Sequence, residues 1–376
     1  MRKRVCIDIS STLLLVSRGY LSGIGRTTYE LISQFDKMKN ELPFDIVLFS
    51  QNTKHISSLN LGLGLASKHL NLPNRKWIDS LLSQFRVKNL FCPSNLWHVP
   101  HNFGITDNLE STIFTLHDML MYTRLDEFPH GAYKKAYKTV PPAMRKCKGI
   151  LTCSNSTKND IVQYMPVNPD KVQVVYWGVN HAIFYPRDIE SSQSYLKDKY
   201  QIERPYFFSV SCNYKRKNTP QLIESYLKLL KNMPLNDLVI IWNDFGEDIK
   251  SMIESSGGRI HVLNNIDDND LAKLYSCATA SFYPSSYEGF GLPVLESMAC
   301  GTPCVTCNNS SLSEVGGDAA IYINSANEIL TAMVELESGQ YDLVSLRERG
   351  ITHASQFTWE RCAKETIDFY KKCLYE

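Results

Sequence analysis

Two carboxylates that could serve one ligand, Glu288 and Glu296, stand eight residues apart with a Gly-x-Gly turn between them. Because Pro is favoured at the first position of a helix, a helix is expected to begin near Leu292 or Pro293. Glu288 then lies in the preceding loop and Glu296 in the first turn. The free N–H groups of a helix N-terminus attract anions. The stretch suits a ligand with a central diphosphate and hydroxyl groups at both ends, although a Glu that only complements the helix dipole would give the same spacing.

Three consecutive cations, Lys215, Arg216 and Lys217, follow the apolar run 206–211 and precede a helix pattern that starts near Pro220. Cations at the end of a strand attract phosphate, and Arg can bind two phosphate oxygens at once. The pattern therefore indicates a phosphate site. A solvated basic turn is the alternative interpretation.

A histidine and an aspartate, His117 and Asp118, directly follow the apolar run 112–116. Ligands of open α/β sheets gather at the carboxyl ends of strands. A His at such an end can hydrogen-bond a sugar hydroxyl or hold charge near a reacting carbon, although a lone His is often structural. His98 and His101 flank another expected strand end and are second candidates, near an acceptor.

A glycine turn, Gly23-Ile-Gly25 followed by Arg26, opens a helix pattern after the first apolar run. Glycines let the backbone approach a ligand closely, and the helix start favours an anion. The third Gly of a dinucleotide fingerprint is missing, which disfavours a nicotinamide cofactor. A flexible loop explains these glycines as well, just as helix capping explains Ser154 before the pattern 156–165.

Short apolar runs alternate with helical patterns along the chain, which predicts an α/β fold with parallel sheets covered on both faces. The expected strands are 5–9, 44–49, 96–99, 112–116, 149–153, 172–175, 206–211, 237–242, 259–263, 280–283, 303–306 and 320–323. The expected helices are 26–37, 132–147, 156–165, 220–230, 267–277, 294–300 and 326–336.

The pattern repeats in two halves, which predicts two Rossmann-like domains with a cleft between them. The turn-rich segment 176–186 and the polar stretch 187–194 indicate that the domain boundary lies between Gly178 and Tyr200. We therefore expect domains at 1–185 and 186–357. The last segment, 358–376, has the pattern of a helix with Thr358 as its N-cap.

The net charge of +1 conceals two halves of opposite charge. Residues 1–185 carry 22 Lys and Arg against 13 Asp and Glu, whereas residues 186–376 carry 18 against 26. The positive excess is densest over 131–148, which includes Lys134, Lys135, Lys138, Arg145, Lys146 and Lys148. Such a basic, partly apolar segment can rest on an anionic membrane, or it can be a solvated helix face. The remaining positive charge is diffuse, which argues against nucleic acid as a partner.

Targeting and metal signals are missing from the sequence. No apolar run reaches the roughly 18 residues of a membrane-spanning helix, and the start lacks a signal-peptide cleavage pattern, so a cytoplasmic protein is expected. Most of the eleven cysteines stand alone in apolar contexts, as in a reducing compartment. Cys304 and Cys307 have zinc-like spacing, but no second Cys or His pair accompanies them, and no metal site is expected.

Three strings together resemble retaining glycosyltransferases of family 4. They are Tyr-Pro-Ser-Ser-Tyr-Glu-Gly-Phe-Gly-Leu-Pro at 283–293, Lys-Arg-Lys-Asn at 215–218 and Thr-Leu-His-Asp at 115–118. The resemblance covers nearly the whole chain. It implies the GT-B architecture, with an acceptor-binding N-terminal domain, a donor-binding C-terminal domain and a last helix that crosses back onto the N-terminal domain.

The resemblance also implies roles for the site residues. Glu288 would approach the donor sugar and Glu296 would hold the ribose hydroxyls. Arg216 and Lys217 would bind the diphosphate, and His117 would contact the donor sugar. The implied donor-binding residues are Gly23, Gly25, Arg26, Gly289, Phe290, Gly291, Leu292 and Glu296, with Asp118, Ser154, His98 and His101 as a second group.

This sequence departs from the family pattern at two places. Ser211 and Cys212 replace the usual Gly and Thr or Arg ahead of the cations, which puts the phosphate geometry in question. In the connector between the domains, Trp177 and Asn180 replace the usual Asn and Asp.

The motif variant at 283–293 resembles the branch rich in bacterial O-antigen and polysaccharide mannosyltransferases. It implies transfer of mannose from GDP-mannose, with retention and without metal or other cofactor, to a glycan or a polyprenyl-diphosphate-linked acceptor. UDP- and dTDP-sugars stay open as donors. The protein would be cytoplasmic, with peripheral contact to the inner face of the membrane. A nucleotide-sugar epimerase and a catalytically silent partner subunit or nucleotide-sugar-binding protein are the alternatives from other classes.

Overall fold

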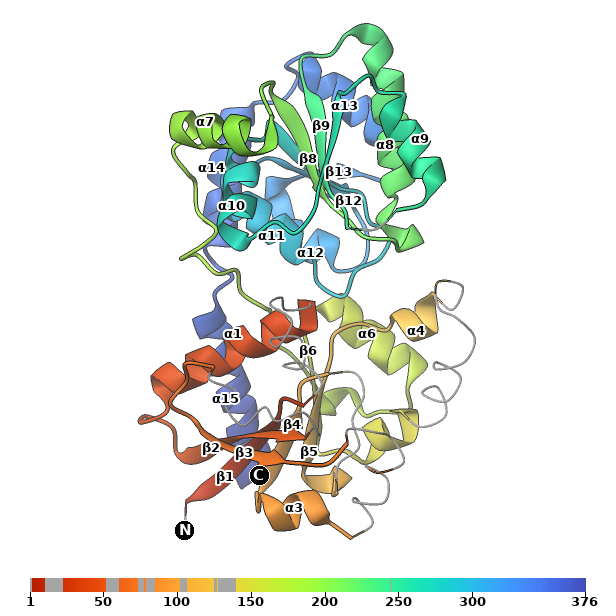
Figure 1. The fold of residues 1–376 in the computed structure, drawn as a ribbon. Coiled ribbons are helices and arrows are strands. Elements are labelled where there is room, and N and C mark those ends of the chain that lie inside the picture. The colour runs from red at the N-terminus through yellow and green to blue at the C-terminus, as the bar shows by residue number, and fades with distance from the viewer. Residues whose placement is uncertain are drawn as a thin grey trace. The chain divides into compact units, whose positions relative to one another are not determined.

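The computed structural model describes residues 2–10, 23–51, 61–73, 78, 85–101, 107–124, 127, 140–243 and 245–376. The chain forms two compact units, drawn in Figure 1. Unit 1 consists of Met1–Gly178 and Trp359–Glu376, and unit 2 consists of Val179–Thr358. Each unit contains one parallel sheet, as the alternating pattern predicts.

The sheet of unit 1 has the strand order β3-β2-β1-β4-β5-β6-β7 in the described part, and every recorded pair is parallel. Its expected strands are confirmed to within two residues at each end, but β3 was not predicted, because this edge strand is half exposed and has the polar sequence Ala-Ser-Lys-His-Leu. The strands are β1 (Lys3–Asp8), β2 (Phe44–Gln51), β3 (Ala66–Leu70), β4 (Leu96–Val99), β5 (Thr112–Leu116), β6 (Gly149–Thr152) and β7 (Val172–Val174).

Helices cover both faces of this sheet (Figure 1). One core joins β1 and β2 to two of the helices, α1 and α15, while a second core lies under α4, α6 and a helical segment at 140–146. The rest of the expected helix 132–147, with Lys134, Lys135 and Lys138, lies largely outside the described residues. The helices of unit 1 are α1 (Gly23–Met38), α3 (Val87–Phe91), α4 (Leu120–Thr123), α6 (Asn155–Tyr164) and α15 (Trp359–Tyr375).

The sheet of unit 2 has the order β10-β9-β8-β11-β12-β13 and is also parallel throughout. All six strands were predicted, because each is a short apolar run; the four central ones, β8, β9, β11 and β12, are buried along nearly their whole length. The six strands are β8 (Tyr206–Val210), β9 (Asp237–Ile241), β10 (Ile260–Leu263), β11 (Ala280–Tyr283), β12 (Cys304–Cys307) and β13 (Ala320–Ile323). The strand β12 accounts for the cysteine pair that resembled a zinc motif, and all eleven cysteines are free.

Seven helices of at least eight residues surround this second sheet in the described part. Three of them were not predicted from the sequence: α7 and α14 carry weak apolar periodicity, and α9 is short and buries none of its residues. The seven helices are α7 (Ile189–Tyr200), α8 (Thr219–Leu229), α9 (Glu247–Glu254), α10 (Asp268–Cys277), α11 (Leu292–Ala299), α13 (Ile329–Glu337) and α14 (Leu343–Ala354), to which the short α12 (Leu312–Gly316) is added.

The units meet in sequence at Gly178 rather than at the expected residue 185. The backbone N–H of Val179 donates to the carbonyl of Phe357 at 3.1 Å, and Val179 forms a bridge with Thr358. This pairing draws residues 179–185 into unit 2. Beyond it, α15 returns to unit 1 and buries Trp359, Ala363 and Tyr370 in the core with α1, as predicted for the last helix.

Each sheet reverses its strand order at one point, between β1 and β4 in unit 1 and between β8 and β11 in unit 2. The loops after two such strands diverge to opposite faces and leave a crevice at the carboxyl edge, where ligands of doubly wound folds bind. In unit 2 this point lies between the loop of Arg216 and Lys217 and the loop of Glu288. The fold therefore brings the predicted cations and the first carboxylate together.

Candidate active site

The three cations form one turn of 3₁₀-helix, Lys215–Lys217, between β8 and α8. Asn218 ends the turn with a φ of 53°, a left-handed conformation that Asn tolerates better than most residues. Its side-chain amide donates to the carbonyl of Pro284 at 2.8 Å. Asn218 thereby fastens the cation turn to the loop that follows β11.

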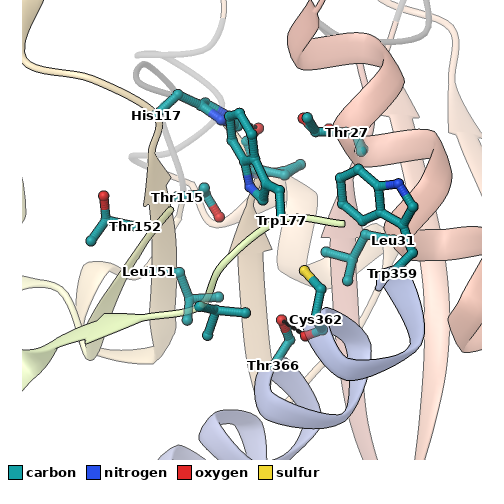
Figure 2. Close-up of a pocket in the computed structure, with 13 residues that line it drawn as sticks. Thr27, Leu31, Thr115, His117, Leu151, Thr152, Trp177, Trp359, Cys362 and Thr366 are labelled. Atoms are coloured by element: carbon teal, nitrogen blue, oxygen red, sulfur yellow. Dashed lines mark hydrogen bonds between the residues drawn. The ribbon is translucent and has the colours of Figure 1, made fainter. Parts of the chain in front are cut away.

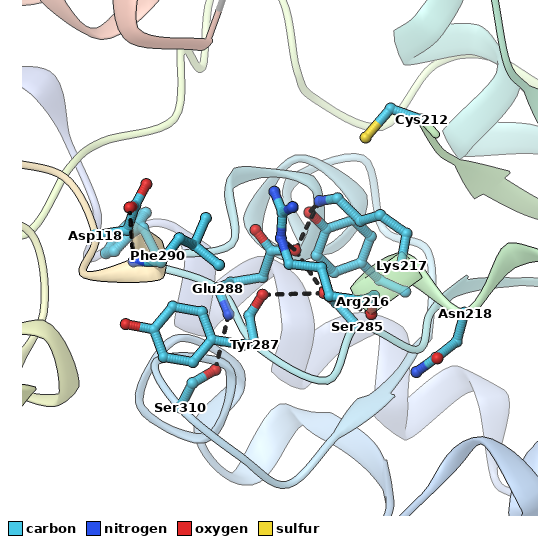
Figure 3. Close-up of polar contacts among 12 residues, drawn as sticks. Asp118, Cys212, Arg216, Lys217, Asn218, Ser285, Tyr287, Glu288, Phe290 and Ser310 are labelled. Atoms are coloured by element: carbon cyan, nitrogen blue, oxygen red, sulfur yellow. Dashed lines mark hydrogen bonds and ion pairs between the residues drawn. The ribbon is translucent and has the colours of Figure 1, made fainter. Parts of the chain in front are cut away.

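An ion pair links the two loops (Figure 3). Lys217 Nζ lies 2.6 Å from Glu288 Oε1, and Arg216 Nε lies 3.9 Å from the same oxygen. Ser285 Oγ donates to Glu288 Oε1 at 2.6 Å, and Lys217 also donates to the hydroxyl of Tyr283. Only about a tenth of each charged side chain is exposed: 9% for Arg216, 11% for Lys217 and 12% for Glu288. Sequence reasoning missed Ser285 and Tyr283, since only the fold brings them to the ion pair.

The carboxyl group of Glu288 is held ionised. Burial raises its pKa, but the charges of Lys217 and Arg216, with hydrogen bonds from Lys217 and Ser285, outweigh burial and bring the pKa below its ordinary value. Burial and the nearby Glu288 raise the pKa of Tyr283 well above its ordinary value, so this hydroxyl stays protonated. The site therefore contains one fixed negative charge between two positive ones, an excess of positive charge that suits an anionic ligand.

Two serines fix the backbone of the Glu288 loop. Ser310 Oγ accepts from Glu288 N at 3.0 Å, and Ser311 Oγ donates to the carbonyls of Glu288 at 2.9 Å and Phe290 at 2.7 Å. Ser310 has a φ of 45°, an uncommon conformation for a residue other than Gly. Local strain of this kind is concentrated at functional sites, where the surroundings hold it in place.

The helix after the glycine turn begins at Leu292, as predicted. Gly291 precedes it with a φ of 116°, a conformation that requires Gly, and a Cβ atom there would also displace Leu312 Cδ2, 2.8 Å away. Glu296 is the fifth residue of α11, one position beyond the first turn in which it was expected, and it is 6% exposed.

In unit 1, His117 follows β5 and is buried, 5% exposed. Its Nε2 lies 2.9 Å from the carbonyl oxygen of Pro100, which can only accept, so Nε2 carries the proton and Nδ1 the lone pair. Burial lowers the pKa of His117 to about 4 and outweighs the bond to Pro100, which acts in the opposite direction. The lowered pKa favours the neutral ring, which suits the expected hydrogen bond to a sugar hydroxyl; contact with the donor sugar stays a prediction.

A small cavity of about 30 Å³ adjoins His117 within unit 1 (Figure 2). The ring of Trp177 lies 5.1 Å from the His117 ring and closes the cavity on one side, so the connector residue that departs from the family pattern contacts a predicted site residue. Threonines and apolar side chains complete the lining, which comprises Thr27, Thr28, Leu31, Pro100, Thr115, Leu151, Thr152, Val175, Trp359, Cys362 and Thr366.

His98 is wrong as a candidate for contact with an acceptor. It is 0% exposed, its Nε2 lies 2.7 Å from Thr115 Oγ1 and its Nδ1 lies 2.5 Å from the hydroxyl of Tyr370 in α15. Burial, with smaller contributions from His117 and His101, lowers the pKa of His98 to about 3. The side chain therefore fastens the last helix to the sheet.

The two buried histidines predict a loss of stability in acid. In the unfolded chain they take up protons near pH 6.5, whereas in the fold they do so only near pH 4 for His117 and pH 3 for His98. Between these values the unfolded state binds more protons, so stability is full above about pH 6.5 and falls as the pH is lowered. Thermal melts from pH 7.5 to 4.5 should show this fall, and it should be shallower in His117→Gln. An identical pH dependence in that variant would contradict the assignment.

Of the other second-group residues, Ser154 and Asp118 make structural contacts at helix starts. Ser154 Oγ caps α6 by accepting from Thr157 N at 3.0 Å, and Asp118 accepts from Leu120 N at 3.0 Å at the start of α4. His101 is half-buried after β4.

The predicted donor-binding glycine turn lies inside the first turn of a helix. Gly23 is the first residue of α1, Gly25 is buried within it and Arg26 is half-buried.

Comparison with known proteins agrees with this geometry. The family description "Glycosyltransferase Family 4" matches residues 21–183, and "Glycosyl transferases group 1" matches residues 193–371. An O-antigen chain mannosyltransferase B from Escherichia coli is 31% identical over 286 residues, 73% of this chain and 74% of that protein. The O-antigen chain mannosyltransferase RfbU from Salmonella typhimurium is 27% identical over 66% of this chain and 64% of its own.

Solved structures share the fold at low sequence identity. Sucrose-phosphate synthase from Thermosynechococcus elongatus superposes with a TM-score of 0.76 at 15% identity, covering 99% of both chains. HepE from Anabaena, solved in complex with UDP-glucose, gives 0.73 at 13% identity, covering 98% of this chain and 99% of that one. The two parallel-sheet units and these matches give the chain the GT-B fold of glycosyltransferases. Within that class, the chain belongs to glycosyltransferase family 4.

Proposed function

We propose that this glycosyltransferase moves mannose from GDP-mannose, with retention, to a hydroxyl group of a glycan or polyprenyl-diphosphate-linked acceptor. The observation that carries the proposal is the ion pair of Lys217 and Glu288 at the switch point of unit 2. The names of the two bacterial O-antigen mannosyltransferases support the choice of sugar. UDP- and dTDP-sugars are the alternative donors.

In the proposed mechanism the protein stabilises the leaving diphosphate. Charge builds up on the phosphate oxygens as the bond to the sugar breaks, and Lys217 and Arg216 offer N–H groups to it in a site with little water. The N-terminus of α11, after Gly291, adds free backbone N–H groups. Glu288, already bonded to Lys217 and Ser285, orients the sugar and does not act as a covalent nucleophile. The departing phosphate oxygen takes the proton of the acceptor hydroxyl.

A thermal-shift screen tests the donor. GDP and GDP-mannose should raise the melting temperature more than UDP, dTDP or their sugars at equal concentration, because a ligand that binds the folded state stabilises it by mass action. A larger shift with a UDP or dTDP compound would contradict GDP-mannose as the donor. If no nucleotide shifts the melting temperature, the alternative of a catalytically silent subunit takes the place of this proposal.

We further propose that transfer needs no metal and no cofactor other than the nucleotide-sugar, since Arg216, Lys217 and a helix N-terminus can together neutralise the diphosphate. Activity measured with EDTA in excess should equal activity without it. Loss of transfer in EDTA, restored by manganese or magnesium, would contradict this.

The proposed acceptor implies work at a membrane. In the described part of the chain, no helix is long and apolar enough to cross one. We propose a cytoplasmic enzyme that contacts the inner face of the membrane peripherally, through the N-terminal half with its positive charge excess. Fractionation of cells into membrane and supernatant, at low and high salt, would test this location.

A further inference from the structure

Large apolar side chains lie exposed at α3 of unit 1. Phe85 is 67% exposed, Leu90 75% and Phe91 39%. Phe85 directly precedes the N-cap residue Arg86, and Leu90 is the fourth residue of α3. These are the two positions that pack on one another in a hydrophobic staple. Here both are largely open to solvent, and apolar side chains gathered in this way mark interaction sites.

The inward side of α3 is already occupied, so these side chains have no place in the core. Cys92, at the end of α3, lies 3.5 Å from Cys6 of β1 (Sγ to Sγ), and the Phe91 ring packs edge-on against Phe49 of β2 at 6.5 Å. Lys88 fills the remaining inward position, 5% exposed, with its Nζ 3.9 Å from Asp8 Oδ2. The apolar side chains of α3 therefore stay exposed in the folded unit, because the inward positions are already filled.

The charge around α3 is positive. Arg86 is exposed, and Lys68 Nζ donates to the carbonyl of Phe91 at 2.8 Å and lies 5.6 Å from its ring. The two carboxylates recorded in contact with α3 are both engaged: Asp8 pairs with Lys88, and Asp107 accepts from Asn89 N at 2.6 Å. Apolar side chains thus lie beside cations that can reach water.

We infer that this α3 surface, made of Phe85, Arg86, Leu90, Phe91 and Lys68, docks the enzyme on an anionic lipid bilayer. Aromatic and aliphatic side chains enter the boundary between head groups and acyl chains, while Lys and Arg stay with the phosphates. A stable protein interface uses about 20–30 residues a side, far more than this surface offers. The inference rests on the proposed function in one respect, since the membrane-linked acceptor explains why the enzyme would bind a membrane. It assigns the membrane contact to α3 rather than to the predicted segment 131–148.

Co-sedimentation of the full chain with vesicles tests the inference. The vesicles are made of phosphatidylcholine alone, or with roughly a third of phosphatidylglycerol. The wild type should bind the anionic vesicles, and added salt should weaken the binding. The double variant Phe85→Ser/Leu90→Ser should bind at least about tenfold more weakly, because both apolar side chains are lost. Arg86→Glu should weaken binding to the anionic vesicles only.

The matched control is Met233→Ser/Leu235→Ser in unit 2, which also removes two exposed apolar side chains, 85% and 67% exposed. It should bind vesicles as the wild type does. Equal binding by the Phe85→Ser/Leu90→Ser variant, or no vesicle binding by the wild type, would overturn the inference. A change in oligomeric state in that variant, by light scattering, would instead assign the surface to a second copy of the chain. The nucleotide thermal shift should stay unchanged in every variant, so its absence from the wild type would count against the proposed function and not against the docking surface.

Discussion

Lys217→Ala is expected to lower kcat by about 10²–10³-fold, the usual effect of removing one preorganised group that stabilises charge in a transition state. Lys217 Nζ bonds both Glu288 and Tyr283 and is nearly buried, and its loss leaves Glu288 with the longer, 3.9 Å ion pair to Arg216. The effect should fall on kcat measured at saturating donor. Lys217→Arg should recover only part of the rate, since a planar guanidinium does not reproduce the geometry of an ammonium group.

The matched control is Lys215→Ala, which removes an exposed cation from the same turn. It should keep wild-type turnover. Circular dichroism and the melting temperature check that Lys217→Ala is folded. Turnover like the wild type in a folded Lys217→Ala protein would exclude the assigned role of this lysine, and an equal loss in Lys215→Ala would reduce the role to net charge.

Glu288→Gln should have the second largest effect, with at least a tenfold loss of transfer and a lower melting temperature. The change removes the negative charge between Lys217 and Arg216, and breaking one side of a buried ion pair costs about 3–5 kcal/mol when the partner charge stays buried. Because the Glu288 side chain is 12% exposed, the loss of stability should lie below the cost for a fully buried pair. Glu288→Ala should lose more activity, because the acceptor for Ser285 disappears as well.

Glu224→Gln, on the exposed side of α8, is the control for loss of a carboxylate and should change neither quantity. A double-mutant cycle with Lys217→Ala separates coupling from independent roles. Since the two side chains are in contact, the losses should not add, and the coupling should reach about 0.5–3 kcal/mol. Fully additive losses would mean that the ion pair has no part in catalysis.

The architecture could be predicted from the sequence wherever burial produced a pattern. Strands such as β8 and β11 are apolar on both faces, so each appears as a short run between helices. The strand β3 and the helix α7 could not be predicted in this way, because they lie at edges where only part of their surface is covered. Their position depends on neighbours that are remote in sequence.

The charged residues of the site could be predicted, but the hydrogen bonds and ion pairs that connect them could not. Arg216, Lys217 and Glu288 were recognisable by type and by place at strand ends. That Ser285 and Tyr283 complete the ion pair depends on the strand register between β8 and β11 and on the shape of the following loop. The burial of His98 could not be predicted from the sequence either, since the helix that covers it, α15, is remote from it in the chain.

The return of α15 to unit 1 sets the order in which the molecule can be completed. Unit 2 is continuous in sequence, whereas the core of unit 1 includes Trp359, Ala363, Ile367 and Tyr370 from the last helix. Domains fold during synthesis as their residues emerge, usually the first domain before the second. Here the first unit to begin is the last to close, because its core needs α15, which is synthesised after the whole of unit 2.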